Sequence, residues 1–200
     1  MSTRLLLLRH GLIKANRDGR WHGSTDSPLT WTGRRQAKRT GRHLLANEKI
    51  HAVYSSPLQR CMDTAKFASA GTNLTVQPIA GLAEMSIGEW EDTSFKELSE
   101  HHDFINRSTT DIHYTAPGGE SLAAVAQRVT EAMLQIDQQH EPDETILVVS
   151  HGVALAVALA VFLEASPSRW INYHFNNCSL SEMVLTPEPV VHRFNESAHL

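Results

Sequence analysis

The chain has 200 residues, of which 41% are hydrophobic and 20% charged, and its formal net charge is −4. This length fits one domain, or one domain with a small insertion, that buries about 70% of the surface its unfolded form exposes. The acidic balance argues against general nucleic-acid binding and favours a small-molecule partner.

We also expect no membrane-spanning segment and no disulfide or metal ion that stabilises the fold. The apolar run Leu5–Leu8 is too short for a signal-peptide core or a membrane span. Cys61 and Cys178 lie far apart without a CxxC pair, so a reducing cytoplasm suits them better than a disulfide framework or a zinc-thiolate site. The twelve histidines contain no HExxH spacing, and we expect neither a metal site nor a cofactor.

The chain opens with a buried strand and a long loop. Arg4 to Leu8 is apolar on consecutive positions, which is typical of a strand covered on both faces, and it leads into Arg9-His10-Gly11. Residues 12–29 are rich in Gly, Asp, Ser and Pro without clear periodicity. Loops of this length in a compact domain usually carry function.

The middle of the chain alternates helices and strands. We predict a helix from Thr30, with either Thr30 or Thr32 as its cap and with Ala37, Leu44 and Leu45 on one face. The elements expected next are a strand at 52–54, a helix from Pro57 to about residue 70 and a strand at 74–76. An irregular stretch, rich in acids, His and Thr, then covers residues 78–118.

The last third begins with the clearest helical pattern in the sequence. Apolar residues follow helical spacing from Leu122 to Ile136, with Glu120 and Ser121 suited to the first turn. A fully apolar strand from Thr145 to Val149 leads into Ser150-His151-Gly152, and an apolar helix follows. Residues 180–185 and 190–194 are expected to pair as a hairpin.

Strands that alternate with helices predict a three-layer α/β fold with a mostly parallel central sheet and helices on both faces. Ligands bind such sheets off the carboxyl ends of the strands, at a topological switch point. Both fully apolar strands end there in a His-Gly pair. If these strands are neighbours, His10 and His151 face each other across one cleft.

The tripeptide Arg9-His10-Gly11 has the residue types that phosphoryl transfer needs. A histidine at a strand end offers a nucleophile, the adjacent arginine offers a cation for phosphate, and Gly11 lets a backbone N–H approach a phosphate oxygen closely. Taken alone, the tripeptide is more typical of a buried structural histidine, and its position at the strand end is what favours function.

A series of further motifs in the same order extends over nearly the whole chain. With them, the sequence resembles the histidine phosphatase superfamily, the phosphoglycerate mutase-like proteins. The motifs are Arg9-His10-Gly11 with Asn16, the segment Gly23 to Thr30, Tyr54 to Arg60 with Thr64-Ala65, Leu82 to Met85 with Gly88 to Glu91, Pro117 to Ser121 with Arg128-Val129, Val148 to Gly152, and Asn177-Cys178-Ser179.

The resemblance implies a role for each catalytic residue. His10 is expected to be the nucleophile, Arg9, Arg60 and His151 to surround the phosphoryl group, and Glu84 to act as general acid and then base. The expected substrate- and phosphate-binding residues are Asn16, Gly11, His22, Gly23 and Gly152. Three nearby acids remain alternatives to Glu84, namely Glu89, Glu91 and Asp92.

The resemblance is strongest to the short bacterial branch, which includes broad-specificity phosphatases and α-ribazole phosphatases. We therefore expect a metal-independent phosphomonoesterase that acts on a small phosphorylated metabolite, with no nucleic-acid or membrane partner and with a homodimer as an option. One domain is expected over residues 1–200, and its insertion at about 78–118 and its loop at 12–29 are expected to set specificity.

Three other functions stay open at this stage. Phosphoglycerate mutases of the superfamily carry additional segments after the Glu-containing stretch, which this chain lacks. A noncatalytic phospho-ligand binding module typically loses the nucleophile, an arginine or the acid, and all of these are present. A metal hydrolase built on His10 and His151 lacks supporting ligand spacing. Two departures from the family pattern, at residues 12–13 and 154–156, bear on the substrate and leave the catalytic set intact.

Overall fold

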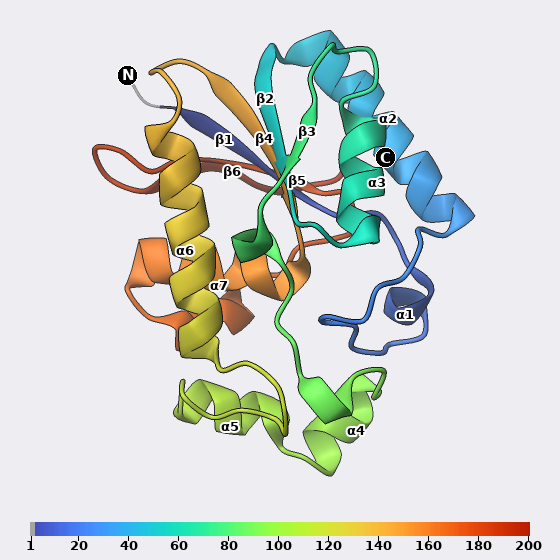
Figure 1. The fold of residues 1–200 in the computed structure, drawn as a ribbon, viewed down its shortest axis with the longest axis vertical. Coiled ribbons are helices and arrows are strands. Elements are labelled where there is room, and N and C mark those ends of the chain that lie inside the picture. The colour runs from blue at the N-terminus through green and yellow to red at the C-terminus, as the bar shows by residue number, and fades with distance from the viewer. Residues whose placement is uncertain (1–2) are drawn as a thin grey trace.

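The computed structural model describes residues 3–200. Its centre is a six-stranded sheet in the order β3-β2-β4-β1-β5-β6 (Figure 1). The pairs β2–β3, β2–β4 and β1–β4 are parallel, whereas β1–β5 and β5–β6 are antiparallel. The strand bounds are β1 Arg4–Arg9, β2 Ile50–Ser55, β3 Val76–Pro78, β4 Thr145–Ser150, β5 Leu180–Val184 and β6 Val190–Glu196.

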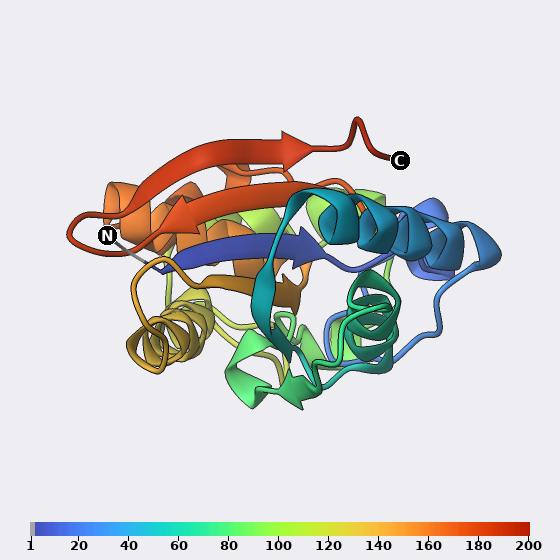
Figure 2. The same cartoon turned by 90° about the horizontal axis from the view of Figure 1, so that it is seen from above.

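Helices cover both faces of this sheet, with α2 and α3 on one face and α6 and α7 on the other (Figure 2). The predicted three-layer α/β fold with a mostly parallel sheet is confirmed. The helix bounds are α1 Lys14–Arg17, α2 Trp31–Asn47, α3 Gln59–Ala68, α4 Phe95–Glu100, α5 Phe104–Thr110, α6 Leu122–Gln138 and α7 Gly152–Glu164.

The strand β1 contributes side chains to the hydrophobic clusters on both faces of the sheet. Alternate side chains of a strand point to opposite faces. Leu5 and Leu7 therefore join the cluster under α6 and α7, whereas Leu6 and Leu8 join the cluster under α2 and α3. All four are at most 2% exposed, and each contributes about 1.5–3 kcal/mol by leaving water.

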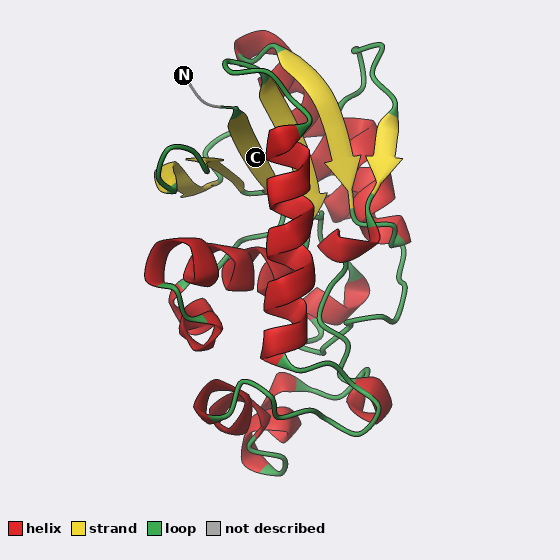
Figure 3. Cartoon of the chain, turned by 60° about the vertical axis from the view of Figure 1, so that its left-hand side comes forward, coloured by secondary structure: helices red, strands yellow, loops and turns green. Residues whose placement is uncertain are grey.

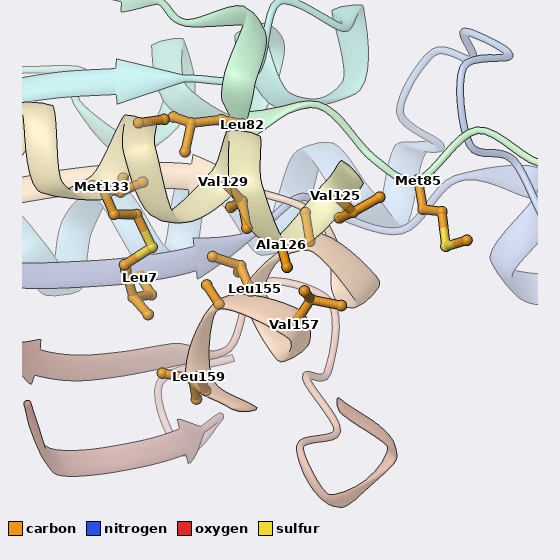
Figure 4. Close-up of a cluster of buried hydrophobic side chains, with 14 of the residues drawn as sticks. Leu7, Leu82, Met85, Val125, Ala126, Val129, Met133, Leu155, Val157 and Leu159 are labelled. Carbon is orange, nitrogen blue, oxygen red and sulfur yellow. The ribbon is translucent and has the colours of Figure 1, made fainter. Parts of the chain in front are cut away.

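The cluster under α6 and α7 is the larger one (Figure 4). Val125, Val129 and Met133 of α6 and Leu155 of α7 are completely buried in it. The same cluster includes Leu82 and Met85, which flank Glu84. The packing of these neighbours holds the backbone on either side of this acid.

The predicted helix starts are confirmed at two positions. Thr30 caps α2 by accepting a hydrogen bond from the Gly33 N–H, and Ser121 caps α6 by accepting one from the Ala124 N–H. Both hydroxyls satisfy a backbone donor that the helix itself leaves without a partner.

Several predicted boundaries were wrong. The segment 12–29 contains the short helix α1, α3 begins at Gln59 rather than at Pro57, and β3 lies at Val76–Pro78. Leu45 is 57% exposed, because Leu44 alone of that adjacent pair faces the sheet. Two neighbouring helical residues point about 100° apart, and only one fits the apolar stripe.

The segment between β3 and α6 was expected to be irregular, and it contains α4 and α5 together with two short 3-10 turns. Figure 3 shows that the arrowheads of the central strands point toward the end of the molecule where these helices lie. The segment thus lies at the carboxyl ends of the strands, where α/β sheets bind ligands. Within residues 3–200, no helix is both long and apolar enough to cross a membrane.

Candidate active site

The parallel pairing of β1 with β4 brings the two His-Gly pairs together. Arg9 lies opposite Ser150 in the register, so the next residue of each strand, His10 and His151, emerges at the same edge. Their imidazole rings meet edge to face, with centroids 5.2 Å apart. The predicted juxtaposition of these histidines is thus present in the structure.

A cavity of about 230 Å³ opens beside His10. Six of the predicted site residues line it, namely Arg9, His10, Asn16, His22, Glu84 and Gly152. The other four, Gly11, Gly23, Arg60 and His151, do not line it. Gly11 and Gly23 adjoin lining residues in the chain, Arg60 donates to the His22 carbonyl, and His151 packs against His10.

The tautomer of His10 follows from its hydrogen bond. Its Nδ1 lies 2.8 Å from the carbonyl oxygen of Gly11. A carbonyl oxygen only accepts, so Nδ1 carries the proton and Nε2 keeps its lone pair. Gly11 is itself fixed, because its N–H donates to Thr64 Oγ1 and the Thr64 hydroxyl donates to the Arg60 carbonyl.

His10 is also held in its neutral form. The ring is 3% exposed, and burial together with the nearby positive charges of Arg60 and Arg9 holds the pKa of His10 well below its usual value. A cationic imidazole has no lone pair to donate. Neutral His10 with a free Nε2 is therefore a nucleophile that needs no separate base.

Arg9 has one buried donor without a protein partner within residues 3–200. One of its terminal nitrogens donates to the Phe175 carbonyl. Its Nε is buried and has no hydrogen-bond partner within residues 3–200. An unpaired buried N–H is costly unless a ligand accepts it, and in a cavity beside a nucleophile the fitting acceptor is an anion. Gly152 leaves room for this group, because a Cβ there would lie 3.3 Å from Arg9 Cζ.

Arg60 lies at the start of α3 and is completely buried. Its terminal nitrogens donate to the carbonyl oxygens of His22, Gly23 and Thr25. Its Nε donates to Nδ1 of His151 at 3.1 Å. Arg60 thus connects the loop after Trp21 to the second histidine.

The hydrogen bonds of His151 fix its tautomer as well. Because Nδ1 accepts from Arg60, Nε2 carries the proton, and it donates to Ser56 Oγ at 2.7 Å. Burial and the positive charge of Arg60 hold the pKa of His151 well below its usual value. His151 is therefore a neutral ring whose edge packs against His10.

Glu84 is held at the start of α7. Its Oε1 accepts from the Ala154 N–H at 3.0 Å, and its Oε2 accepts from the Val153 N–H at 3.1 Å. The first N–H groups of a helix have no partner within the helix, and they bind carboxylates. The carboxyl group is 9% exposed and lines the same cavity as His10.

The three alternative acids are placed differently. Glu91 accepts hydrogen bonds from the backbone of residues 23–25, and Asp92 pairs with His22 at 2.9 Å. Glu89 is exposed. None of these three lines the cavity, whereas Glu84 does.

Some of the predicted binding residues line the cavity and others do not. Asn16 lines the cavity, and its Oδ1 accepts from Asn177, whose side-chain amide also donates to the His10 carbonyl. His22 lines it too, with its ring nitrogens bonded to Ser27 and Asp92. Gly23 does not, since its N–H donates to Glu91.

Sequence reasoning missed most of the cavity wall. Aromatic side chains from three separate segments line it, namely Trp21, Phe95, Trp170, Tyr173 and Phe175. Phe95, Trp170, Tyr173 and Phe175 lie in segments without a motif. Two basic groups, Arg20 and His174, complete the wall. Elsewhere, residues 3–200 contain no group of three or more His, Cys, Asp or Glu side chains arranged to hold a metal ion.

Comparison with known proteins places these features in a family. The family model of the histidine phosphatase superfamily (branch 1) matches residues 5–197. Phosphoserine phosphatase 1 of Hydrogenobacter thermophilus is 30% identical over 201 residues, covering 99% of this chain and 94% of its own. A crystal structure of a phosphoserine phosphatase from Entamoeba histolytica, in complex with 3-phosphoglyceric acid, superposes with a TM-score of 0.88 at 29% identity and covers 99% of both chains.

Other relatives are longer than this chain. A bifunctional protein of Mycobacterium tuberculosis is 36% identical over 180 residues, which is 90% of this chain and 49% of that protein. The chain thus spans about half the length of the first curated relatives it matches.

Proposed function

Because the chain belongs to the histidine phosphatase superfamily, we propose that it hydrolyses small phosphomonoesters through a phosphohistidine formed on His10. The observation that carries this proposal is the state of His10. Its Nδ1–H is bound to the Gly11 carbonyl and its ring is held neutral, so the Nε2 nitrogen keeps its lone pair. The same cavity is lined by Arg9, whose buried Nε has no hydrogen-bond partner within residues 3–200.

The first half-reaction transfers the phosphoryl group to the enzyme. His10 Nε2 attacks phosphorus, the P–O bond to the leaving group breaks, and the leaving oxygen takes a proton from the carboxylic acid form of Glu84. The Arg9 guanidinium binds the non-bridging oxygens, whose charge a planar fork matches. Glu84 and Arg9 line one cavity with His10, which supports these assignments.

The second half-reaction regenerates the enzyme. Glu84, now a carboxylate, takes a proton from a water molecule whose oxygen attacks phosphorus. The P–N bond breaks, and inorganic phosphate leaves. The N–H groups of Val153 and Ala154 support the carboxylate form of Glu84 in this step, since they donate to both of its oxygens.

Arg60 and His151 are assigned to the phosphoryl group by the family pattern, and this stays a prediction. Their contacts support a role through His10. Arg60 contributes positive charge that favours neutral His10, and the rings of His151 and His10 meet edge to face. Arg60 therefore helps to keep the imidazole unprotonated, and His151 helps to hold it in place for attack.

Small phosphorylated acids are the first substrates to test. The Entamoeba histolytica relative was crystallised with 3-phosphoglyceric acid, and the Hydrogenobacter thermophilus relative is a phosphoserine phosphatase. Arg20 on the cavity wall offers positive charge for a second anionic group, and His174 offers a ring nitrogen on the same wall. We also propose a cytoplasmic location, which the buried free thiols of Cys61 and Cys178 support, and a single domain with its specificity insertion at about 78–118.

The proposal is tested by a phosphatase screen over phosphorylated metabolites in EDTA, with phosphoserine, 3-phosphoglycerate and α-ribazole phosphate included. We expect release of inorganic phosphate from at least one of them and no loss of rate in the chelator. Binding of these compounds without phosphate release would instead favour a noncatalytic module. Isomerisation of 3-phosphoglycerate without net release would favour a mutase.

A further inference from the structure

Glu91 occupies a nest of backbone donors next to the active site. Its Oε2 accepts from the N–H groups of Gly23 and Thr25, and its Oε1 accepts from those of Ser24 and Ile87. The distances lie between 2.9 and 3.1 Å. Three consecutive N–H groups turned toward one carboxylate form an anion-binding concavity of the kind that loops use for phosphates.

The loop cannot move far from this carboxylate without losing its packing. A Cβ on Gly23 would lie 2.1 Å from the Met85 carbonyl oxygen and 2.5 Å from Glu91 Oε1. Only glycine allows so close an approach. The backbone of residues 23–25 is therefore fixed against Glu91 and against the residue that follows Glu84.

The carbonyl groups of the same loop are bound to Arg60. Gly23 and Thr25 each donate an N–H to Glu91, and each accepts from the Arg60 guanidinium at 2.7 Å. These residues thus lie between an anion and a cation that do not touch each other. Two peptide groups are bound at both ends: the His22 and Gly23 carbonyls accept from Arg60, and the N–H groups of the same two peptides, on Gly23 and Ser24, donate to Glu91. A peptide group polarised from both ends makes stronger hydrogen bonds than either contact alone gives.

Beyond the loop, Arg60 acts on both histidines of the site. Its Nε donates to His151 Nδ1, which fixes the second histidine, and its charge reaches His10. A chain of contacts therefore runs from the Glu91 carboxylate through residues 23–25 to Arg60 and then to His151 and His10.

We propose that Glu91 is a positioning residue for phosphoryl transfer, which acts through the backbone of residues 23–25 to hold Arg60 against His151. The carboxylate touches neither the cavity nor the reacting atoms. Its effect on the reaction is therefore indirect. The inference rests on the proposed function, because it needs a reaction whose rate Arg60 controls.

The test compares Glu91→Gln, Glu91→Asp and Glu89→Gln in the full chain, with p-nitrophenyl phosphate as substrate and vanadate as inhibitor. Gln has nearly the size of Glu but replaces one acceptor oxygen with an NH₂ that faces backbone donors. We expect kcat/KM to fall about 10- to 100-fold, since displacements of about 1 Å have effects of that order. Glu91→Asp keeps the carboxylate on a side chain one methylene shorter, so its loss should be smaller than that of Glu91→Gln, about three- to tenfold. Glu89→Gln removes the same charge from an exposed neighbour and should match the wild type.

A double-mutant cycle with Arg60→Lys separates positioning from stability. If Glu91 acts through Arg60, Glu91→Gln should cost little further activity in the Arg60→Lys background, and the two losses should not multiply. Losses that multiply, or a Glu91→Gln enzyme within threefold of the wild type in both kcat/KM and vanadate inhibition, would overturn the inference. If Glu91→Gln does not fold, Glu91→Asp takes its place in the cycle. Its kcat/KM should then fall at least threefold in the wild-type background and should change little in the Arg60→Lys background.

The proposed function is judged separately, on the wild-type protein alone. A wild type that hydrolyses no phosphomonoester would refute both the function and the inference. An active, vanadate-sensitive wild type combined with an unaffected Glu91→Gln variant would refute the inference only.

Discussion

The Nδ1–H of His10 donates to the carbonyl oxygen of Gly11 at a distance of 2.8 Å. This contact between adjacent residues decides which nitrogen of the nucleophile is free. Gly11 therefore acts on the nucleophile through its backbone carbonyl. Its lack of a side chain has a different reason, which is the close packing of Gly11 against α2. A Cβ on Gly11 would lie 2.6 Å from the Gly33 carbonyl oxygen in α2.

The buried, neutral state of His10 predicts a pH-dependent stability. Because its folded pKa is lowered, the unfolded chain binds a proton near pH 6.5 that the folded chain does not. The contribution of neutral His10 to the free energy of unfolding is fully present above pH 6.5, and it is lost as the pH falls toward the pKa of His10 in the folded state. Chemical denaturation should show that His10→Asn costs about 1.4 kcal/mol less at pH 5.5 than at pH 8. An equal cost at both pH values would show that His10 titrates alike in both states.

The unpaired donor of Arg9 predicts an anion site. Vanadate, which mimics the five-coordinate transition state, should inhibit at millimolar concentration or below. Arg9→Met should weaken vanadate inhibition about 10- to 100-fold, the effect of losing a charged hydrogen bond. Arg34→Met removes an exposed arginine of α2 and should leave the inhibition constant unchanged. If vanadate inhibits Arg9→Met as strongly as the wild type, Arg9 is not part of the anion site.

The acid role of Glu84 predicts a dependence on the leaving group. An aryl phosphate leaves with little protonation, whereas an alkyl phosphate needs a proton from the enzyme. Glu84→Gln should therefore slow alkyl phosphate hydrolysis more than aryl phosphate hydrolysis, by about 10- to 100-fold, within the 10²–10⁴ range of general acid catalysis. The measurement is kcat/KM for a matched pair of esters. Equal losses on both would remove Glu84 from the acid role.

The sequence was sufficient where the signal is local and periodic. Consecutive apolar residues identified β1 and β4, and helical spacing identified α6. The two His-Gly pairs at strand ends then led to the meeting of His10 and His151, because parallel neighbouring strands place their carboxyl ends side by side.

The rest of the site depends on contacts between distant segments, which leave no pattern in a single sequence. Glu91 was read as a possible acid, and only the fold shows that backbone N–H groups surround its carboxylate. Arg60 was expected in the cavity, and the structure shows its donors bound to loop carbonyls and to His151. The aromatic walls from Phe95 and Trp170 arise in segments without a motif.

The most direct test of the account is to trap the phosphoenzyme and locate its phosphoryl group. Rapid quenching of the wild type with a labelled substrate should yield an acid-labile, base-stable phosphate, which ³¹P NMR and peptide mapping should assign to Nε2 of His10. His10→Asn should show neither this adduct nor turnover. A phosphoryl group on Nδ1, on another residue, or turnover retained in His10→Asn would contradict the account.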